Sequence, residues 1–240
     1  MLVKTEAIVV KKTAYTDHSA VVKLFTKEFG LTSFIIQGLH GKQNKNSLIQ
    51  PGTIIELVFH KKYQGLMRAK ELSLISGWGY RHLPIHDQVR WFFLELLNHV
   101  LHEEQPEESL FLLSKETFTA LNEGVENLSV LPIYFLYNFC KETGHALQID
   151  AESMRKGLDI LGGGYANDRS LPIHTIGPED CTLLHQIAIE KRTNVLLKSR
   201  RVIIGHLLAY IQIHVIPGKT LQSLNILQDI TQGSHQIGHY

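Results

Sequence analysis

The first 75 residues consist of short apolar runs separated by polar residues, and several runs alternate with the two-residue period of a β-strand. The runs are rich in β-branched and aromatic residues and predict strands over 6–10, 19–26, 32–37, 53–60 and 66–74. Five short strands without an intervening helix indicate a small antiparallel barrel, and the OB-fold is the commonest five-stranded example. An SH3-like barrel has the same pattern and stays open as an alternative.

The third and fourth predicted strands are joined by a segment that is too long for a hairpin. Residues 38–52 read GLHGKQNKNSLIQPG, whereas a hairpin needs about two to five connecting residues. Connections of this length without their own secondary structure are usually functional or disordered. We therefore expect a polar loop that buries no apolar side chain.

Beyond residue 78 the apolar positions are spaced by three and four residues, which is the period of an α-helix. This spacing, with prolines at helix starts and glycines at helix ends, predicts helices over 89–101 and 110–121, from Pro132 to Gly144, from Pro178 onward and over 202–215. Residues 145–177 show no clear period. The chain is thus predicted to be an α+β protein, with an N-terminal five-stranded OB-fold barrel domain at 1–78 and an all-α helical domain at 79–240.

The composition is that of a globular protein, with 44% hydrophobic and 20% charged residues. No apolar run approaches the ~20 residues of a membrane span, and the first apolar stretch is too short for a signal peptide, so a cytoplasmic location is expected. The net charge of +1 hides an asymmetry: residues 1–75 hold eleven Lys and Arg against five Asp and Glu, while residues 76–240 hold thirteen against eighteen. A basic N-terminal third points to a module that binds a polyanion.

The sequence contains no GxSxG, HExxH or GxxxxGK[ST] motif. Residues 162–164 are three glycines that do not follow a predicted strand, so they indicate a loop rather than a dinucleotide site. Cys140 and Cys181 lie far apart without a CxxC partner, which argues against a disulfide framework and a thiolate zinc site. We expect both to be buried thiols and assign no catalytic residue, metal or cofactor.

One cluster leaves a metal-dependent enzyme open as an alternative. Glu95, His99, His102 and Glu103 could share one face of a predicted helix, and carboxylate and imidazole sets of this kind bind metal in helical bundles. A solvated helix face between Leu-rich core positions explains the same pattern, and no second Glu-x-x-His helix is visible.

The basic side chains of the predicted barrel are a stronger functional signal. They stand at the ends of the first and fourth strands, in the 38–52 segment and at alternate positions of the fifth strand: Lys11, Lys12, Lys42, Lys45, Lys61, Lys62, Arg68 and Lys70. On a small barrel they could converge on one groove, where each lysine that meets a phosphate releases counterions and adds salt-sensitive affinity. Tyr63, in a predicted turn, is the candidate base-stacking residue that we most expect to be exposed, because Phe25, Phe34 and Phe59 fit a barrel core better.

A second basic cluster lies in the helical part, where KRTNVLLKSRR carries five positive charges: Lys191, Arg192, Lys198, Arg200 and Arg201. Contact with phosphates and a solvated helix end explain this run equally well. Together with neighbouring apolar helix residues, the run would also suit an acidic tail that ends in a hydrophobic residue.

Several turn and strand residues recur in the order of a known family. EAIVV is followed by YTDHSAVVKLFTKEFGLTSFIIQGLHGKQNKNSLIQPGTIIELVF, which resembles the N-terminal domain of the bacterial recombination mediator RecO, with its Y-x-D/E-x-S turn, LFT-x-E-x-G hairpin and LQP-x-T strand entry. Farther on, LLNHVLHEEQPEESLFLLSKETFTALN resembles the first helical pair of that family, and GKTLQSLNIL resembles its C-terminal segment. The resemblance covers nearly the whole chain and is weakest over 145–180.

The resemblance implies an OB-fold followed by a helical domain, and a non-enzymatic role in recombinational DNA repair. It implies binding of single- and double-stranded DNA, annealing of complementary strands, and displacement of single-strand-binding protein so that RecA can load. The implied partners are RecR, in some species RecF, and the acidic C-terminal tail of single-strand-binding protein. The implied location is cytoplasmic and nucleoid-associated.

This sequence departs from the family at two places. The basic loop of the family falls on residues 41–47, where only Lys42 and Lys45 are basic, so we expect weaker affinity through this loop. Many members carry a four-cysteine zinc module in the helical domain, whereas the insert around 145–180 here lacks the cysteines, so no zinc is expected. An OB-type nucleic-acid binder without mediator activity stays open as an alternative function.

Overall fold

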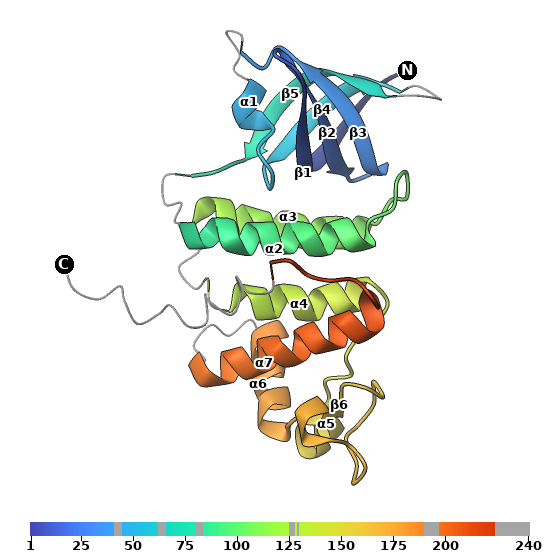
Figure 1. Cartoon of the computed structure of the whole chain (residues 1–240), viewed down its shortest axis with the longest axis vertical. Coiled ribbons are helices and arrows are strands. Elements are labelled where there is room, and N and C mark those ends of the chain that lie inside the picture. The colour runs from blue at the N-terminus through green and yellow to red at the C-terminus, as the bar shows by residue number, and fades with distance from the viewer. Residues whose placement is uncertain are drawn as a thin grey trace, which may run out of the picture. The chain divides into compact units, whose positions relative to one another are not determined.

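The computed structural model of the chain forms two compact units, Met1–Val125 and Glu126–Tyr240. Figure 1 shows the helices and strands of both units. The residues that the structure describes are 1–40, 45–61, 66–79, 84–124, 128, 130–189 and 197–223, with only the backbone of Pro84, Leu197 and Lys198. Within these ranges, no helix is long and apolar enough to cross a membrane.

The first unit begins with a closed barrel of five strands, in the spatial order β1-β2-β3-β5-β4 with β4 paired back to β1. All neighbours are antiparallel except β3 and β5, which are parallel. This connectivity is that of the OB-fold, so the predicted fold is confirmed and the SH3-like alternative is dropped. The strands are β1 (Leu2–Thr16), β2 (Ser19–Thr26), β3 (Gly30–Gln37), β4 (Ile54–His60) and β5 (Met67–Ser76).

The barrel interior is filled by the alternate side chains that the strand pattern predicts. Phe34 and Phe59 are fully buried there, and their rings meet edge to face with centroids 5.0 Å apart. Val9, Leu24 and other aliphatic side chains complete this core.

The segment between β3 and β4 does not form the polar loop that was expected. It contains a short helix, α1 (Lys45–Leu48), and it places Leu39 and Ile49 in the barrel core, with Leu48 packed against that core. The expectation of no apolar burial was therefore wrong. The open end of a barrel exposes its core to water, and covering that end gains more than leaving the segment free. Residues 41–44 of this segment lie outside the described residues.

Two antiparallel helices, α2 (Pro84–Val100) and α3 (Glu108–Glu123), belong to the same compact unit as the barrel. Phe25 of β2 faces them and packs edge to face against Phe111 of α3, with ring centroids 5.4 Å apart. The Nζ of Lys115 on α3 also bonds the carboxylate of Glu6 on β1 at 2.8 Å. The division into a barrel domain at 1–78 and a helical domain at 79–240 remains a prediction.

A buried guanidinium joins the barrel to these helices. Arg90 of α2 has no exposed surface, and it donates hydrogen bonds to Asp87 at 2.5 Å and to the side-chain oxygen of Asn122 at 2.9 Å. Its guanidinium carbon also lies 4.4 Å from the ring centroid of Trp78, which follows β5. Asn122 of α3 in turn donates to the carbonyl oxygen of Gly52 at 3.3 Å. Burial lowers the pKa of Arg90, while the charge of Asp87 opposes that shift.

The second unit is built around three helices that pack on one another: α4, α6 and α7. The stretch 145–177, which shows no clear hydrophobic period, contains only short helices and strands. Each of them is shorter than the roughly 11 to 18 residues over which hydrophobic periodicity can be recognised. One of them, α5, starts at a capping box in which the Asp150 carboxylate accepts from the backbone N–H of Ser153 and the Ser153 hydroxyl accepts from that of Asp150. The elements are α4 (Leu131–Glu142), α5 (Ala151–Lys156), β6 (Leu158–Asp159), η1 (Pro172–His174), β7 (Thr175–Ile176), α6 (Pro178–Ala188), α7 (Leu197–Tyr210) and the π-helical turn η2 (Ile211–Val215).

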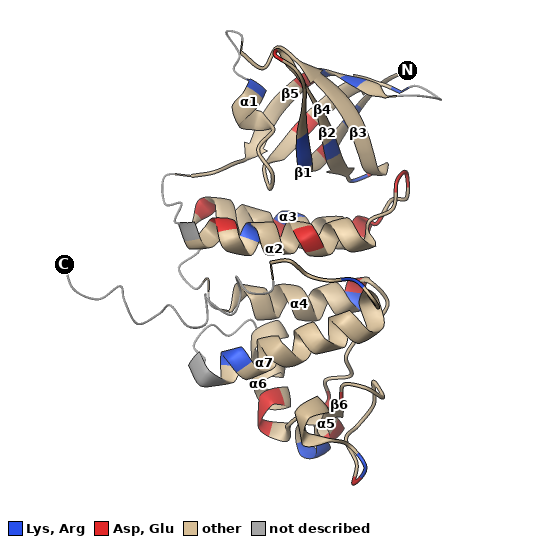
Figure 2. Ribbon diagram, in the orientation of Figure 1, with Lys and Arg blue, Asp and Glu red and all other residues tan. Residues whose placement is uncertain are grey.

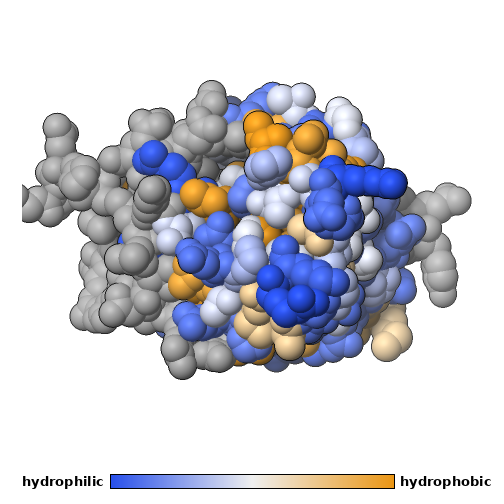
Figure 3. Space-filling view, turned by 90° about the horizontal axis from the view of Figure 1, so that it is seen from below, coloured by the Kyte–Doolittle hydropathy of each residue, from blue (hydrophilic) through white to orange (hydrophobic). Residues whose placement is uncertain are grey.

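The surface of the second unit near α5 is mixed in character. Figure 3 looks at this end and shows hydrophilic surface interrupted by separate hydrophobic areas. Exposed large apolar side chains of this part of the chain include Leu161, Leu171 and Ile173. Leu161 lies just after β6 and Ile173 lies just before β7, and these two strands pair with each other. The hydrogen bond from Ile160 N–H to the carbonyl of His174, 2.8 Å long, extends this pairing toward both residues.

The junction at Arg90 predicts how two glycines in the same segment tolerate a side chain. Gly52 and Gly38 both have left-handed backbones, with φ of 84° and 78°, so alanine at either position costs about 1 kcal/mol. At Gly52 an added Cβ would lie 2.5 Å from the Cδ of the fixed Arg90 side chain, whereas at Gly38 it meets nothing within 4 Å. Gly52→Ala should therefore lower the free energy of unfolding by about 2 to 4 kcal/mol.

The measurement is urea unfolding followed by tryptophan fluorescence. The chain has two tryptophans, and both Trp78 and Trp91 lie in the first unit, so the signal reports that unit. Gly38→Ala is the matched control. Equal unfolding midpoints for the two variants would show that Arg90 does not constrain Gly52.

The two cysteines predict a second measurable property. Both thiols are buried and free, as the sequence predicted, and burial raises the pKa of Cys140 to about 12 and that of Cys181 to about 11. Both are almost wholly protonated at pH 8, and only the thiolate is reactive. Native protein should therefore react very slowly with Ellman's reagent at pH 8 and should release two equivalents on denaturation. Fast reaction of one thiol in the native protein would contradict this burial.

Candidate nucleic-acid interface

The outer surface of the barrel carries basic residues from several strands. Lys11 of β1 is paired across the sheet with Lys23 of β2, and Lys23 is paired with Ser33 of β3. The next row reads Thr13, Val21, Ile35 and Arg68. Directly paired residues of neighbouring strands lie on the same side of a sheet, so Lys11, Lys23 and Arg68 all point outward from the closed barrel. Figure 2 shows the Lys and Arg positions on the barrel strands and on α1.

Ion pairing separates the cations of the first unit into two groups. Those with a carboxylate partner are Lys4 with Glu56, Lys23 with Glu103, Lys27 with Glu108, Arg90 with Asp87 and Lys115 with Glu6. Within the described part of this unit, six cations make no such pair: Lys11, Lys12, Lys45, Lys61, Arg68 and Lys70. All six are among the DNA-binding residues that the sequence predicted.

The pair of Lys11 and Lys23 is unfavourable for the isolated protein. Like charges directly opposite each other on two strands destabilise a sheet. Glu103 compensates the charge of Lys23 at 3.2 Å, but Lys11 is exposed and has no carboxylate partner among the described residues. A bound phosphate at this position would relieve the repulsion, which makes this outer face a good site for a polyanion.

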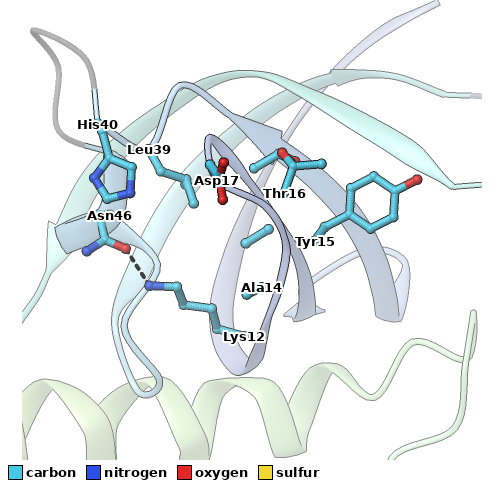
Figure 4. Close-up of a pocket in the computed structure, with 10 residues that line it drawn as sticks. Lys12, Ala14, Tyr15, Thr16, Asp17, Leu39, His40 and Asn46 are labelled. Carbon is cyan, nitrogen blue, oxygen red and sulfur yellow. Dashed lines mark hydrogen bonds between the residues drawn. The ribbon is translucent and has the colours of Figure 1, made fainter.

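Lys12 lies on the other side of β1 from Lys11 and lines a pocket at the open end of the barrel. Its Nζ donates to the side-chain oxygen of Asn46 on α1. The pocket has a volume of about 430 Å³ and is also lined by Tyr15, Asp17 and His40. Figure 4 shows Lys12 bonded to Asn46 beside His40, while the Tyr15 ring points away from them. The sequence predicted that Lys11 and Lys12 end the first strand. This was wrong, because β1 continues to Thr16.

The remaining predicted barrel residues are placed as follows. Lys45 is half-buried at the start of α1, Lys70 is exposed on β5, and Lys61 is exposed after β4 with its Nζ 4.9 Å from the ring centroid of Phe29. Lys42, Lys62 and Tyr63 lie outside the described residues. The structure thus places Lys11 and Arg68 on the outside of the barrel and Lys12 in the pocket.

The aromatic residues that could stack on a base are either fully buried or clearly exposed. Phe25, Phe34 and Phe59 have no exposed surface, so they are core residues and cannot stack on a base. Tyr15, which the sequence reasoning missed, is 64% exposed beside the turn between β1 and β2. The available signal was its position in the polar stretch YTDH, where an aromatic ring has no apolar neighbours to pack against.

Only part of the second basic cluster, Lys191 to Arg201, lies among the residues that the structure describes. Lys191 and Arg192 lie outside the described residues, and the side chain of Lys198 is not described. Arg201 is exposed on α7. Arg200 is half-buried, and its Nε has no hydrogen-bond partner in the part of the chain that the structure describes.

The proposed helical metal cluster does not form. Helix α2 ends at Val100, so His102 and Glu103 follow the helix instead of sharing a face with Glu95 and His99. Glu103 forms the ion pair with Lys23 and a bridge with Leu31 of β3. Among the described residues, no group of three or more His, Cys, Asp or Glu is placed to hold a metal ion. The metal-enzyme alternative therefore loses the constellation on which it depended.

Comparison with known proteins agrees with this architecture. The family model "Recombination protein O N terminal" matches residues 1–78, and the model "Recombination protein O C terminal" matches residues 91–157. The chain is 26% identical to the DNA repair protein RecO of Flavobacterium psychrophilum and 26% identical to that of Phocaeicola vulgatus, in each case over 96% of this chain and 99% of the relative. It is 24% identical to the DNA repair protein RecO of Christiangramia forsetii over the same shares.

The matched models cover the barrel and much of the helical part, and the relatives align along almost their whole length. The OB-fold barrel carries outward-pointing cations that have no carboxylate partner in the described ranges, which agrees with a protein that acts on DNA. The chain belongs to the RecO family of DNA repair proteins.

Proposed function

We propose that the protein is a non-catalytic recombination mediator that binds single- and double-stranded DNA and anneals complementary strands. In this role it helps RecA to load onto DNA that is coated with single-strand-binding protein. The family membership supports the role, and one structural observation supports the means: Lys11, Lys45, Arg68 and Lys70 of the first unit carry charges without a carboxylate partner in its described part.

The physics of annealing requires such charges. Two complementary strands repel each other through their phosphates, and lysine or arginine neutralises that charge and releases condensed counterions. Contacts to phosphates read no base sequence, so one surface can hold either strand or the product duplex. A protein that acts on any repair site needs this tolerance.

The proposed partners are RecR, in some species RecF, and the acidic C-terminal tail of single-strand-binding protein. The run from Lys191 to Arg201 supports the last of these, since it combines positive charge with apolar helix residues. The exposed Arg201 and Val202 on α7 belong to this run or adjoin it. An acidic tail with a hydrophobic end requires a site of this chemistry.

The outer-face assignment predicts the salt dependence of DNA binding. The double variant Lys11→Ala/Arg68→Ala removes two phosphate contacts, so the slope of log affinity against log salt for single-stranded DNA should flatten by about 0.7 per contact. Fluorescence titration of a labelled oligonucleotide at several salt concentrations measures this slope. The variant Lys42→Ala/Lys45→Ala tests the segment between β3 and β4 in the same way.

The matched control is Lys4→Ala/Lys27→Ala. It removes the same number of charges, but Glu56 and Glu108 already neutralise these two lysines, so the slope should stay close to that of the wild type. If Lys11→Ala/Arg68→Ala and the control changed the slope equally, the outer face would not be the DNA-binding surface.

The mediator role is tested by annealing strands coated with the cognate single-strand-binding protein. The chain should speed the pairing of a fluorophore-labelled strand with a quencher-labelled complement, and it should do so less with single-strand-binding protein that lacks its acidic tail. Equal acceleration with both forms would remove the tail as a partner. Binding of DNA without any acceleration would leave only a general OB-fold nucleic-acid binder.

A further inference from the structure

Residues 145–177 of the second unit are ordered although they contribute little to a hydrophobic core. All of these residues are described, and four of their apolar side chains are buried: Leu147, Leu158, Ile160 and Ile176. Fixing each residue of a chain costs conformational entropy, so a stretch with so little apolar burial needs other interactions to hold it. Small segments of this kind often depend on a metal ion or on disulfides.

The first set of such interactions is centred on the carboxylate of Asp150. Its Oδ1 accepts from the backbone N–H groups of Glu152 at 3.0 Å and Ser153 at 2.9 Å, at the start of α5. Its Oδ2 accepts from the hydroxyl of Tyr165 at 2.6 Å and from the side-chain amide of Gln148 at 3.0 Å. The bond from Tyr165 lowers the pKa of Asp150. Asp150 therefore joins the start of α5 to a residue fifteen positions farther along the chain.

The second set is centred on the carboxylate of Asp159 in β6. Its Oδ1 accepts from the backbone N–H groups of Leu161 at 3.0 Å and Gly162 at 3.3 Å. Its Oδ2 accepts from the hydroxyl of Ser170 at 2.9 Å, and this bond lowers the pKa of Asp159. The backbone N–H of Asp159 also donates to the carbonyl of Gly164 at 2.8 Å. Asp159 thus closes the glycine loop and ties it to a residue eleven positions farther on.

The segment that these carboxylates cross-link is anchored to the helices of the second unit. The Nε2 of His214, in η2, donates to the carbonyl oxygen of Ile160 at 2.7 Å. The ring of His214 lies against that of Tyr210 at the end of α7, with centroids 4.4 Å apart. A β-carbon at Gly163 would lie 4.0 Å from the hydroxyl of Tyr210. The glycine loop is therefore docked at the C-terminal end of α7.

The donors of this segment do not fit a zinc ion. A structural zinc site takes four ligands, and in a four-cysteine module these are thiolates. Residues 145–177 contain no cysteine, and Asp150 and Asp159 already accept hydrogen bonds on both of their carboxylate oxygens. The flanking Cys140 and Cys181 are protonated at neutral pH, since burial raises their pKa values to about 12 and about 11. The ligand set of the zinc module of the family thus has no counterpart in this segment.

We propose that Asp150 and Asp159 provide in this chain the cross-links that a zinc ion provides in a four-cysteine module, so that residues 145–177 fold without metal. Each carboxylate binds two backbone N–H groups of one turn and the hydroxyl of a distant residue, Tyr165 or Ser170. Hydrogen bonds to an ionised group are stronger than those between neutral groups. Two such acceptors therefore hold a segment that lacks a core of its own.

The test is hydrogen–deuterium exchange of the full chain, followed by mass spectrometry of peptic peptides that cover residues 148–170. Protection of the wild type should be the same in EDTA and with one equivalent of zinc. Tyr165→Phe and Ser170→Ala each remove one hydroxyl and no charge. Each should speed exchange of these peptides about tenfold, because one hydrogen bond to a charged group is worth about that factor.

Tyr137→Phe is the matched control for Tyr165→Phe, because it removes a tyrosine hydroxyl of the same unit that bonds to no carboxylate among the described residues. Asp159→Asn removes the charge of one cross-link and should also speed exchange. Its control is Asp168→Asn, which removes an exposed carboxylate of the same segment. Both controls should exchange like the wild type.

Two outcomes would overturn the proposal. One is exchange like that of the wild type in both Tyr165→Phe and Ser170→Ala, which would show that the carboxylate bonds do not hold the segment. The other is faster exchange of the wild type in EDTA, which would show that a metal ion holds it. Peptides from the barrel strands report whether each variant is folded, and if one hydroxyl variant fails to fold, the other decides the question.

Discussion

A fully buried guanidinium, that of Arg90, holds the end of the barrel against α2 and α3. A buried charge is costly unless its polar neighbours are in place, so the hydrogen bond from Arg90 to Asn122 restricts how α2 and α3 lie against each other, while Asp87 of the same helix balances the charge. Asn122 passes the restriction to the carbonyl of Gly52, which ends the segment between β3 and β4. That segment carries α1 and Asn46, the partner of Lys12. The position of Asn46 in the pocket therefore depends on how the other end of this segment, at Gly52, packs against Arg90 and Asn122.

The second organising feature is the distribution of charge partners. Carboxylates from the loop after α2 and from α3 neutralise Lys23 and Lys27 of the barrel, whereas Lys11 and Arg68 face solvent without such partners in the described part of the first unit. Exposed ion pairs add little stability. Their main effect here is to neutralise some of the barrel lysines and leave others positively charged. The residues after and on the helices of the first unit thus decide which barrel lysines keep an unpaired positive charge, and a barrel sequence alone does not contain them.

The strands were predictable because alternation of apolar and polar residues is a local property, and Phe34 and Phe59 fall at core positions in any register that buries one face. The segment at 38–52 was misjudged for the opposite reason. Leu39 and Ile49 are separated by polar and glycine residues, so their spacing has no period, and only closure of the barrel gives them a common core to enter. The cluster of Glu95, His99, His102 and Glu103 failed because the helix ends at Val100, a boundary that spacing does not fix within a turn.

The sequence by itself determined the fold class, the basic character of the N-terminal third and the family, because each is encoded in residue order and composition. The tertiary structure alone decided which basic residues act together. Lys115 finds Glu6 across 109 residues of chain and Lys23 finds Glu103 across 80, and no local pattern records such partners. The pocket beside Lys12 is also a tertiary property, since it is lined by the first hairpin together with Leu39, His40 and Asn46 of the segment between β3 and β4. Contacts between residues far apart in the sequence therefore determine which lysines are neutralised and where the pocket forms, and local sequence patterns cannot show either.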